Sequence, residues 1–307
     1  MTCAYTVALC THNHADRLPR TLSDLPRLRL PKAEWEFLIV DNASSDSTPE
    51  LLARHPWPDG WKVRVVREAK LGLSNARNRA IAEARGEYII FLDDDETADP
   101  DWLCAYERLI EAHAPDAFGG RIEVLFEGGR PVWLRDELLG FLGQLNRHAA
   151  IAQLTGPGES FYGGNFGFRS NLCGRIGAFD ADLGRKGQDN TGGEEVDFYR
   201  RLLNAGLKVW WTPDAVIHHR IQAVKLDRRY FIDLHYRQGR MEAIRLRGYA
   251  SRLPPFYLAG QIGRALLAVW RAFRSSGRNA TLRQEMNVAY FVGYLIGWTS
   301  RRSKPLH

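Results

Sequence analysis

The feature that most constrains the fold is a short apolar run that ends in carboxylates. Residues 88–92 are all aromatic or aliphatic, which is typical of a strand buried on both faces of a sheet. Asp93, Asp94 and Asp95 follow at once, with Glu96 behind them. Open α/β sheets bind ligands at the carboxyl ends of their strands, so this position favours a ligand site. The alternative is an acidic loop that caps the following helix.

The spacing of these carboxylates indicates what the ligand would be. Side chains alternate along an extended chain, so Asp93 and Asp95 are expected to point the same way. Residues two apart on a strand are separated by about 7 Å, because the rise is about 3.3 Å per residue. Two oxygen ligands at this distance suit a divalent cation and the phosphates that it holds.

Strands and helices are predicted to alternate through the first hundred residues. Strands are expected at 5–10, 35–40, 62–67 and 88–92, and helices at 15–25, 49–54 and 72–84. This alternation predicts an α/β fold with a doubly wound, mainly parallel sheet. Polar residues after three of the strands should meet at one edge of it. No GxGxxG motif follows the first strand and no GxxxxGK[ST] motif occurs, which excludes the usual glycine-cradled nucleotide site.

The second part of the chain has a different pattern. Beyond residue 116 we expect strands at 119–126 and 161–169, a pair of strands within 209–220, and a helix that opens at 192. From 221 to 307 the chain is predicted to be helical and basic.

Charge is distributed unevenly along the chain, whose net charge is +6. Residues 220–307 contain 17 Lys and Arg against 4 Asp and Glu, whereas residues 1–219 contain 25 against 32. No standard nucleic-acid-binding motif accompanies the basic region, so an anionic membrane surface is the favoured partner. Segments 258–273 and 286–298 are expected to be either ordinary packed helices or an interfacial helix pair. Neither is predicted to span a bilayer.

The cysteines bear on the compartment. Cys3, Cys10, Cys104 and Cys173 are scattered without CxxC or CxH spacing, which argues against a zinc site or a disulfide framework and predicts a reducing cytoplasm. A strand-like run begins at Tyr5, so no secretory signal peptide is expected. Peripheral attachment to the cytoplasmic face of the membrane is a further hypothesis.

Five short segments occur in a fixed order. They are VALCTHN at 7–13, VDNASSDST at 40–48, GLSNARNRAI at 72–81, FLDDD at 91–95 and GEEVD at 193–197. Each is weak evidence alone, but together they resemble the family 2 inverting glycosyltransferases of GT-A fold, over residues 5–219. Residues 119–122, 164–169, 183–187 and 193–195 are further similar to bacterial and archaeal members that build surface glycans, some on polyprenyl-phosphate-linked acceptors.

The resemblance implies a domain organisation. Residues 1–220 would form a GT-A catalytic domain of the nucleotide-diphospho-sugar transferase type. Within it, 1–116 would be the nucleotide-binding half and 117–220 the acceptor half. Residues 221–307 would be the basic helical C-terminal region.

The resemblance also assigns nucleotide-sugar-binding residues. Thr11 and Asn13 would line the nucleotide pocket, or alternatively cap a helix. Asp41 would accept a hydrogen bond from the base, and a buried acceptor rejects bases that lack the matching donor. Arg77 could equally form a surface ion pair of little energetic value. The implied set is Thr11, Asn13, Asp41, Arg77, Asn78, Asp93 and Asp94.

The family's DxD motif matches Asp93 and Asp95. The first would meet the ribose or the metal, and the second would coordinate the metal that bridges the diphosphate. His219 matches a histidine that family members often carry near the diphosphate or metal, with His218 as the alternative. The implied cofactor is therefore Mn²⁺ or Mg²⁺, with Asp95 and His219 as metal ligands, and an imidazole ligand slightly favours Mn²⁺.

An inverting transfer needs one carboxylate to deprotonate the attacking acceptor hydroxyl. Family members commonly place this base at the second acid of a pair that opens a helix, which here is Glu195, with Glu194 and Asp197 as alternatives. These acids could instead complement the helix dipole. The implied acceptor-side residues are Gly164, Asn165 and Glu194.

The resemblance implies metal-dependent, inverting transfer of a sugar from a nucleotide-diphosphate donor. The acceptor would be a glycan or a polyprenyl-linked molecule in the synthesis of cell-surface polysaccharide or glycoconjugate. The alternative is a non-catalytic nucleotide-binding partner in a glycan-assembly complex. A nucleotidyltransferase is disfavoured, because the glycine-rich, lysine-containing signature that it needs near the N-terminus is absent.

Overall fold

The computed structural model describes residues 3–184, 193–246 and 253–299. These residues belong to two compact units, one formed by 1–125 with 143–220 and the other by 126–142 with 221–307. Residues 126–142 were expected in the acceptor half, but they group with the helical region. Parts of the segment at 183–187, the expected helix start at 192 and the basic tail from 300 lie outside the described residues.

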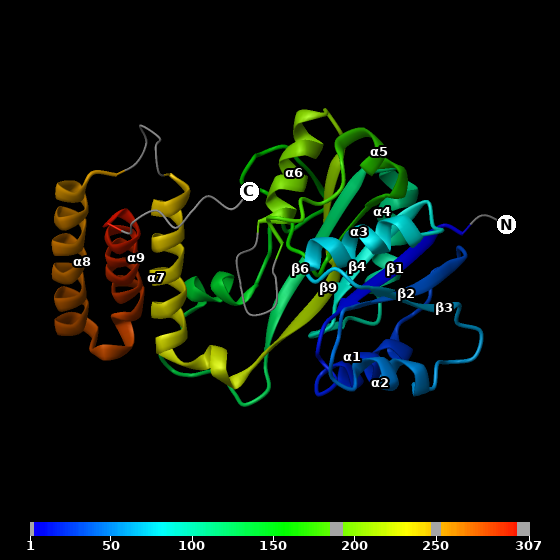
Figure 1. Ribbon diagram of the computed structural model, residues 1–307, viewed down its shortest axis with the longest axis horizontal. Coiled ribbons are helices and arrows are strands. Elements are labelled where there is room, and N and C mark those ends of the chain that lie inside the picture. Colours follow the sequence, from blue (N-terminus) through cyan, green and yellow to red (C-terminus); the bar gives the residue numbers. More distant parts are fainter. Residues whose placement is uncertain (1–2, 185–192, 247–252, 300–307) are drawn as a thin grey trace. The chain divides into compact units, whose positions relative to one another are not determined.

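The first half of the first unit is a parallel sheet of four strands (Figure 1). Its order is β3-β2-β1-β4, and every neighbouring pair is parallel. The elements are β1 (Tyr5–Thr11), α1 (Leu18–Asp24), β2 (Trp35–Asn42), α2 (Thr48–Arg54), β3 (Val63–Glu68), α3 (Leu73–Glu83) and β4 (Tyr88–Asp93). β1 and most of β2 and β4 are buried, as their continuous apolar sequences predict.

The sheet continues beyond β4 in the order β8-β6-β9-β5, and β7 pairs with β9. The pairs β4–β8, β6–β8, β5–β9 and β7–β9 are antiparallel. The elements are β5 (Glu96–Ala98), α4 (Trp102–His113), β6 (Ala117–Phe126), β7 (Ala152–Leu154), β8 (Phe166–Arg169), α5 (Cys173–Ile176), α6 (Glu194–Asn204) and β9 (Val209–Ile221).

Two expectations about these strands were wrong. The strand expected at 161–169 begins only at Phe166, after the turn that carries Gly163 and Gly164. The expected pair of strands within 209–220 is the single strand β9. The first residues of β9 pair with β7, and residues 217–219 of β9 pair with β5. Pro213 lies between the residues that pair with β7 and those that pair with β5.

An aromatic core connects the strands to α6. Phe166 stacks on Phe161 with ring centroids 4.6 Å apart, and Phe179 stacks on Phe198, also at 4.6 Å. Phe91 of β4 stacks on Phe166 at 5.1 Å. All five rings are buried, so this core fixes α6 relative to the carboxyl end of β4.

The second unit consists mainly of helices. They are α7 (Arg228–Arg245), α8 (Pro255–Ser276) and α9 (Leu282–Thr299). α9 packs against both α7 and α8 (Figure 1). A Cβ atom on Gly293 of α9 would lie 2.0 Å from the Tyr236 carbonyl of α7, so these two backbones approach closely because no side chain intervenes. No helix among the described residues is long and apolar enough to cross a membrane.

Short 3₁₀ helices complete the described structure. They are η1 (Leu25–Arg27), η2 (Asp136–Leu142), η3 (Ser170–Leu172), η4 (Ala223–Leu226) and η5 (Arg278–Ala280).

Candidate active site

Polar residues meet at the carboxyl edge of the parallel strands. Thr11, the last residue of β1, pairs with Asp41 of β2, and the preceding residue Cys10 pairs with Asp93 of β4. Thr11 and Asp41 are buried. The Thr11 hydroxyl has no hydrogen-bond partner among the described residues, and a buried polar group without a partner is costly. A bound ligand that supplied this partner would remove that cost.

Arg77 of α3 is the centre of the site. Its side chain is 1% exposed, so the alternative of a surface ion pair is wrong. Its Nη1 donates to Glu194 Oε1 at 2.9 Å and to Glu195 Oε1 at 3.3 Å, and its Nη2 donates to Asp93 Oδ1 at 3.4 Å. Burial alone would lower the pKa of Arg77, but Glu195, Asp93 and Glu194 together raise it above its ordinary value. The guanidinium therefore stays charged and connects β4 with α6.

The three candidate bases at the start of α6 differ in their surroundings. Glu194 is buried, and burial raises the pKa of its carboxyl more than Arg77 lowers it. Asp197 accepts a hydrogen bond from Arg201 Nε at 2.9 Å, one turn along the helix. Glu195 remains 19% exposed while it contacts Arg77. Of the three, Glu195 combines contact with the buried cation and access to a substrate.

Two glycines let these groups approach one another. A Cβ on Gly163 would lie 2.2 Å from Arg77 Nη2 and 2.4 Å from Glu195 Oε1. A Cβ on Gly164 would lie 2.1 Å from both carboxyl oxygens of Glu96. Burial, followed by the charges of Asp93 and Asp95, raises the pKa of Glu96 well above its ordinary value.

Asp95 and His219, the two predicted metal ligands, lie close together. His219 Nε2 lies 3.4 Å from Asp95 Oδ2, whereas His218 Nδ1 lies 3.8 Å from Glu123 Oε2. An oxygen and an imidazole nitrogen at this separation can bind one divalent cation. Within the described ranges no group of three or more His, Cys, Asp and Glu side chains is arranged to hold a metal. Most of the coordination shell would therefore come from substrate phosphates and water, which is common for Mg²⁺.

Sequence reasoning missed two partners of the acidic run. Asp94 is buried and its Oδ2 lies 2.6 Å from His14 Nδ1. Glu96 accepts a hydrogen bond from the Asp93 amide at 3.0 Å. His14 and Glu96 were both noticeable in the sequence, since His14 follows the first strand closely and Glu96 ends the acidic run. Their positions in the sequence do not indicate which residue each one contacts.

The loop after β1 is held by the loop after β2. Asn13 has a positive φ of 52°, and its Oδ1 accepts hydrogen bonds from the amides of Ser45 at 2.7 Å and Asp46 at 3.3 Å. Asp41 Oδ1 accepts a hydrogen bond from the Ser44 amide at 3.2 Å. These contacts order the edge at which the nucleotide was predicted to bind.

Two predicted site residues use their side chains to hold the fold. Asn165 is fully buried and accepts hydrogen bonds from Trp102 Nε1 and the Tyr106 hydroxyl, while its Nδ2 donates to the carbonyls of Arg121 and Ala215. Asn78 bonds both the amide and the carbonyl of Phe179 at 2.9 Å. Both side chains therefore hydrogen-bond to other parts of the protein. A direct contact of either side chain with substrate stays a prediction.

The half-sheet of parallel strands, with carboxylates at the end of β4 and an acidic pair at the start of α6, is the arrangement expected of a GT-A fold. Residues 6–177 match the sequence model described as Glycosyl transferase family 2. The chain belongs to this family.

Three curated relatives show how far the similarity extends. Succinoglycan biosynthesis protein ExoM of Rhizobium meliloti is 24% identical over 235 residues, which cover 76% of this chain and 72% of ExoM. Glucosyl-dolichyl phosphate glucuronosyltransferase of Haloferax volcanii is 24% identical over 173 residues, 55% of this chain and 54% of the relative. Uncharacterized protein y4gI of Sinorhizobium fredii is 32% identical over 198 residues, 61% of this chain but only 18% of the relative. The chain thus spans about half or less of two of these three relatives.

Solved structures confirm the predicted GT-A fold. Mannosyltransferase PcManGT from Pyrobaculum calidifontis, in complex with GDP-Man and Mn²⁺, is similar with a TM-score of 0.61 at 20% identity, over 96% of this chain and 88% of PcManGT. S. aureus TarS in complex with UDP-GlcNAc is similar with a TM-score of 0.53 at 14% identity, over 95% and 90% of the two chains.

Proposed function

We propose that the protein is a metal-dependent inverting glycosyltransferase. It transfers a sugar from a nucleotide-diphosphate donor to a glycan or lipid-linked acceptor in the synthesis of surface polysaccharide or glycoconjugate. The observation that carries this proposal is the buried Arg77, whose hydrogen bonds reach Asp93 on β4 and Glu195 on α6. A donor-binding carboxylate and a candidate base are thereby held beside one cation. The name of ExoM, a succinoglycan biosynthesis protein, supports a role in polysaccharide synthesis, and the UDP-GlcNAc bound to TarS supports a nucleotide-sugar donor.

On the donor side, the carboxyl edge of β1, β2 and β4 binds the nucleotide. The unpartnered hydroxyl of Thr11 bonds the nucleotide, and the buried carboxylate of Asp41 accepts a hydrogen bond from the base. Asp93 meets the ribose or the metal. Asp94, which contacts His14, supports this edge from the opposite side of the strand end.

Asp95 and His219 would hold a divalent cation, Mn²⁺ or Mg²⁺. The proposal is supported by their separation of 3.4 Å and by their mixed oxygen and nitrogen donor set. When bound, the ion supplies positive charge to the leaving diphosphate.

Glu195 is the base in the transfer step. Its carboxylate takes the proton from the acceptor hydroxyl while the hydroxyl oxygen forms a bond to the anomeric carbon. The bond from that carbon to the phosphate oxygen breaks, and its electron pair leaves with the nucleoside diphosphate. Attack from the face opposite the leaving group inverts the configuration. Arg77 keeps Glu195 in position, and Gly163 leaves room for both side chains.

We place the protein in the cytoplasm, peripherally attached to the inner face of the membrane. Four free cysteines, Cys3, Cys10, Cys104 and Cys173, support a reducing compartment. The basic C-terminal region supports attachment to anionic lipid.

The base assignment is tested with Glu195→Gln. This variant should bind the nucleotide donor normally but transfer sugar about 10²–10⁴ times more slowly, which is the usual contribution of a general base. Transfer is measured by product formation and donor binding by calorimetry. Asp197→Asn, in the same helical turn, is the control and should stay active. Normal transfer by Glu195→Gln would show that another group is the base.

The metal assignment is tested separately with Asp95→Ala, which should weaken metal-dependent donor binding itself.

A wild type that binds the nucleotide but transfers no sugar to any acceptor would favour the alternative of a non-catalytic binding partner.

A further inference from the structure

One face of α8 is covered by no other element among the described residues of its unit. α8 packs against α9 and η5, whereas α9 packs against both α7 and α8. Leu258 and Ala265 of α8 are buried, and they lie on one helical stripe because they are seven residues apart. The other described side chains of α8 are half-buried or exposed. The two helices that the sequence grouped as an interfacial pair are therefore not equivalent, because α9 is the central helix.

The open face carries large apolar side chains. Leu266 is 53% exposed, Trp270 55% and Phe273 57%. They follow one another at intervals of four and three residues, so they form a continuous stripe along the helix. Phe256 near the start of the helix is 81% exposed and Leu267 45%. Soluble proteins rarely expose so many large apolar groups together unless the surface has a partner.

Arginines border this apolar stripe. Arg264, Arg271 and Arg274 are exposed, and at 100° per residue they fall on the side of the stripe that faces away from α9. The guanidinium of Arg274 lies 5.2 Å from the centre of the Trp270 ring. Residues 253–284 contain five arginines and no lysine, aspartate or glutamate. The face therefore combines apolar rings with uncompensated positive charge.

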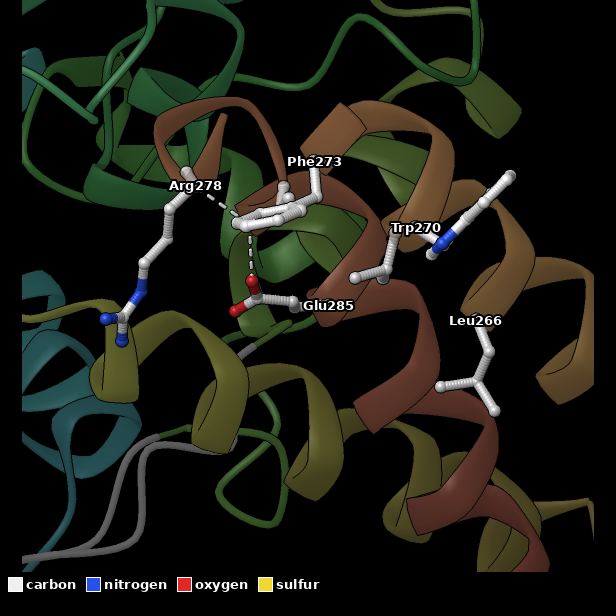
Figure 2. Close-up of a pocket in the computed structure, with 7 residues that line it drawn as sticks. Leu266, Trp270, Phe273, Arg278 and Glu285 are labelled. Atoms are coloured by element: carbon white, nitrogen blue, oxygen red, sulfur yellow. Dashed lines mark hydrogen bonds between the residues drawn. The ribbon is translucent and has the colours of Figure 1, made fainter. Parts of the chain in front are cut away.

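A hollow of about 390 Å³ lies beside the stripe, between α8 and the start of α9 (Figure 2). Its apolar wall includes Leu266, Trp270 and Phe273, and its polar end includes Arg278, Thr281 and Glu285. The carboxylate of Glu285 pairs with Arg228 at 2.8 Å. The apolar wall matches an acyl chain, and Arg278 at the polar end can contact an anionic headgroup.

We propose that this face of α8 is the surface by which the protein docks on an anionic lipid bilayer. The helix lies in the plane of the interface, the rings of Trp270 and Phe273 enter the acyl region, and the arginines contact the headgroups. Self-association through the same face is disfavoured, because it would bring the exposed arginines of two copies together, and the nearest acid in the sequence, Glu285, already pairs with Arg228. The proposal gives a defined surface to the peripheral attachment proposed above and rests on that part of the proposed function.

The experiment is sedimentation of the full chain with vesicles. One set is phosphatidylcholine alone, and the other is phosphatidylcholine mixed with phosphatidylglycerol, each at low and high salt. The wild type should bind the mixed vesicles, more weakly at high salt, and should bind pure phosphatidylcholine poorly. No binding to the mixed vesicles would overturn the proposal.

Two variants test the face itself. Replacing Trp270 and Phe273 together by serine should weaken partitioning roughly tenfold or more, because each aromatic ring loses its transfer into lipid. Val132→Ser removes an apolar side chain that is 90% exposed elsewhere in the same unit and should leave binding unchanged. Replacing Arg264, Arg271 and Arg274 by glutamine should weaken binding to the mixed vesicles roughly fivefold for each arginine, which corresponds to about 1 kcal/mol.

Equal binding by the serine variant and the wild type would show that another surface docks. A dimer of the wild type that the serine variant abolishes, without lipid binding, would show that the face joins two copies. Calorimetric nucleotide binding by the same variants separates this proposal from the catalytic one. Nucleotide binding should be the same in these variants as in the wild type, whether or not lipid binding is lost. If the wild type bound no nucleotide, only the catalytic proposal would be overturned.

Discussion

At the scale of single residues, Arg77 is expected to have a large effect on stability. Its removal leaves buried Glu194 and the neighbouring Asp93 and Glu195 without their cation. Breaking a buried ion pair in this way typically costs about 3–5 kcal/mol. We therefore expect Arg77→Met to lower the free energy of unfolding by about that amount in urea denaturation.

The same helix offers a control for that prediction. Arg79 of α3 pairs with Glu83 at 2.8 Å, and both side chains are partly exposed. Arg79→Met should cost less than about 1 kcal/mol, as exposed ion pairs do. Equal small losses in the two variants would mean that Arg77 does not hold the site together.

A second residue-scale prediction concerns pH and His14. The hydrogen bond that His14 makes to the Asp94 carboxylate raises the pKa of His14 above its ordinary value of 6.5, with a smaller contribution from Asp95, while burial and Arg17 lower it. A histidine whose pKa is raised on folding stabilises the fold below pH 6.5, and this contribution is lost as the pH rises through the raised folded value.

The free energy of unfolding of the wild type should therefore exceed that of His14→Gln most at acidic pH, and the difference should shrink as the pH rises. Measurements in chelator avoid competition from metal at the neighbouring Asp95. A difference that stays constant with pH would show that the ion pair does not titrate as proposed.

The sequence does not reveal which distant residues contact one another. Asp94 contacts a histidine 80 positions away, and Arg77 contacts a glutamate 117 positions away. The motifs singled out the carboxylates, the arginine and the acidic pair, because polar residues after buried strands are recognisable locally. Which of them meet is decided by tertiary packing, so the burial of Arg77 became evident only in the structure.

At the scale of elements, the contact between α7 and α9 depends on glycine. Gly293→Ala would place a methyl group 2.0 Å from the Tyr236 carbonyl, and overpacking of this kind usually costs about 1–3 kcal/mol. Gly263→Ala on α8, where nothing lies within 4 Å, should instead stabilise the helix by up to about 1 kcal/mol. Thermal unfolding of both variants tests this, and a neutral Gly293→Ala would contradict the close packing.

Elements of the parallel half were predictable, whereas those of the other half were less so. β1, β2 and β4 begin at the predicted residues, because each is a continuous apolar run bounded by polar residues. β8 is shorter than expected and β9 is one strand, because the turn at Gly163 and the partners of β9 are set by distant segments. The short strands β5 and β7 carry no periodic signal at all.

At the scale of the whole molecule, the two units have different proposed tasks. The first carries the predicted nucleotide, metal and base residues, and the second carries the exposed face of α8. The separation of residues 126–142 from the sheet unit was not visible in the sequence, because that segment shows no periodic pattern that would assign it to either unit.

The central claim is that the carboxyl edge of the sheet binds a nucleotide diphosphate through a metal. Calorimetric titration of the wild type with UDP, GDP, CDP and TDP tests it directly, each with Mn²⁺ and again with chelator. We predict that one of the four binds in the presence of Mn²⁺, that chelator abolishes this binding, and that Asp95→Ala weakens it. A folded protein that binds none of the four nucleotides with Mn²⁺ would contradict the account.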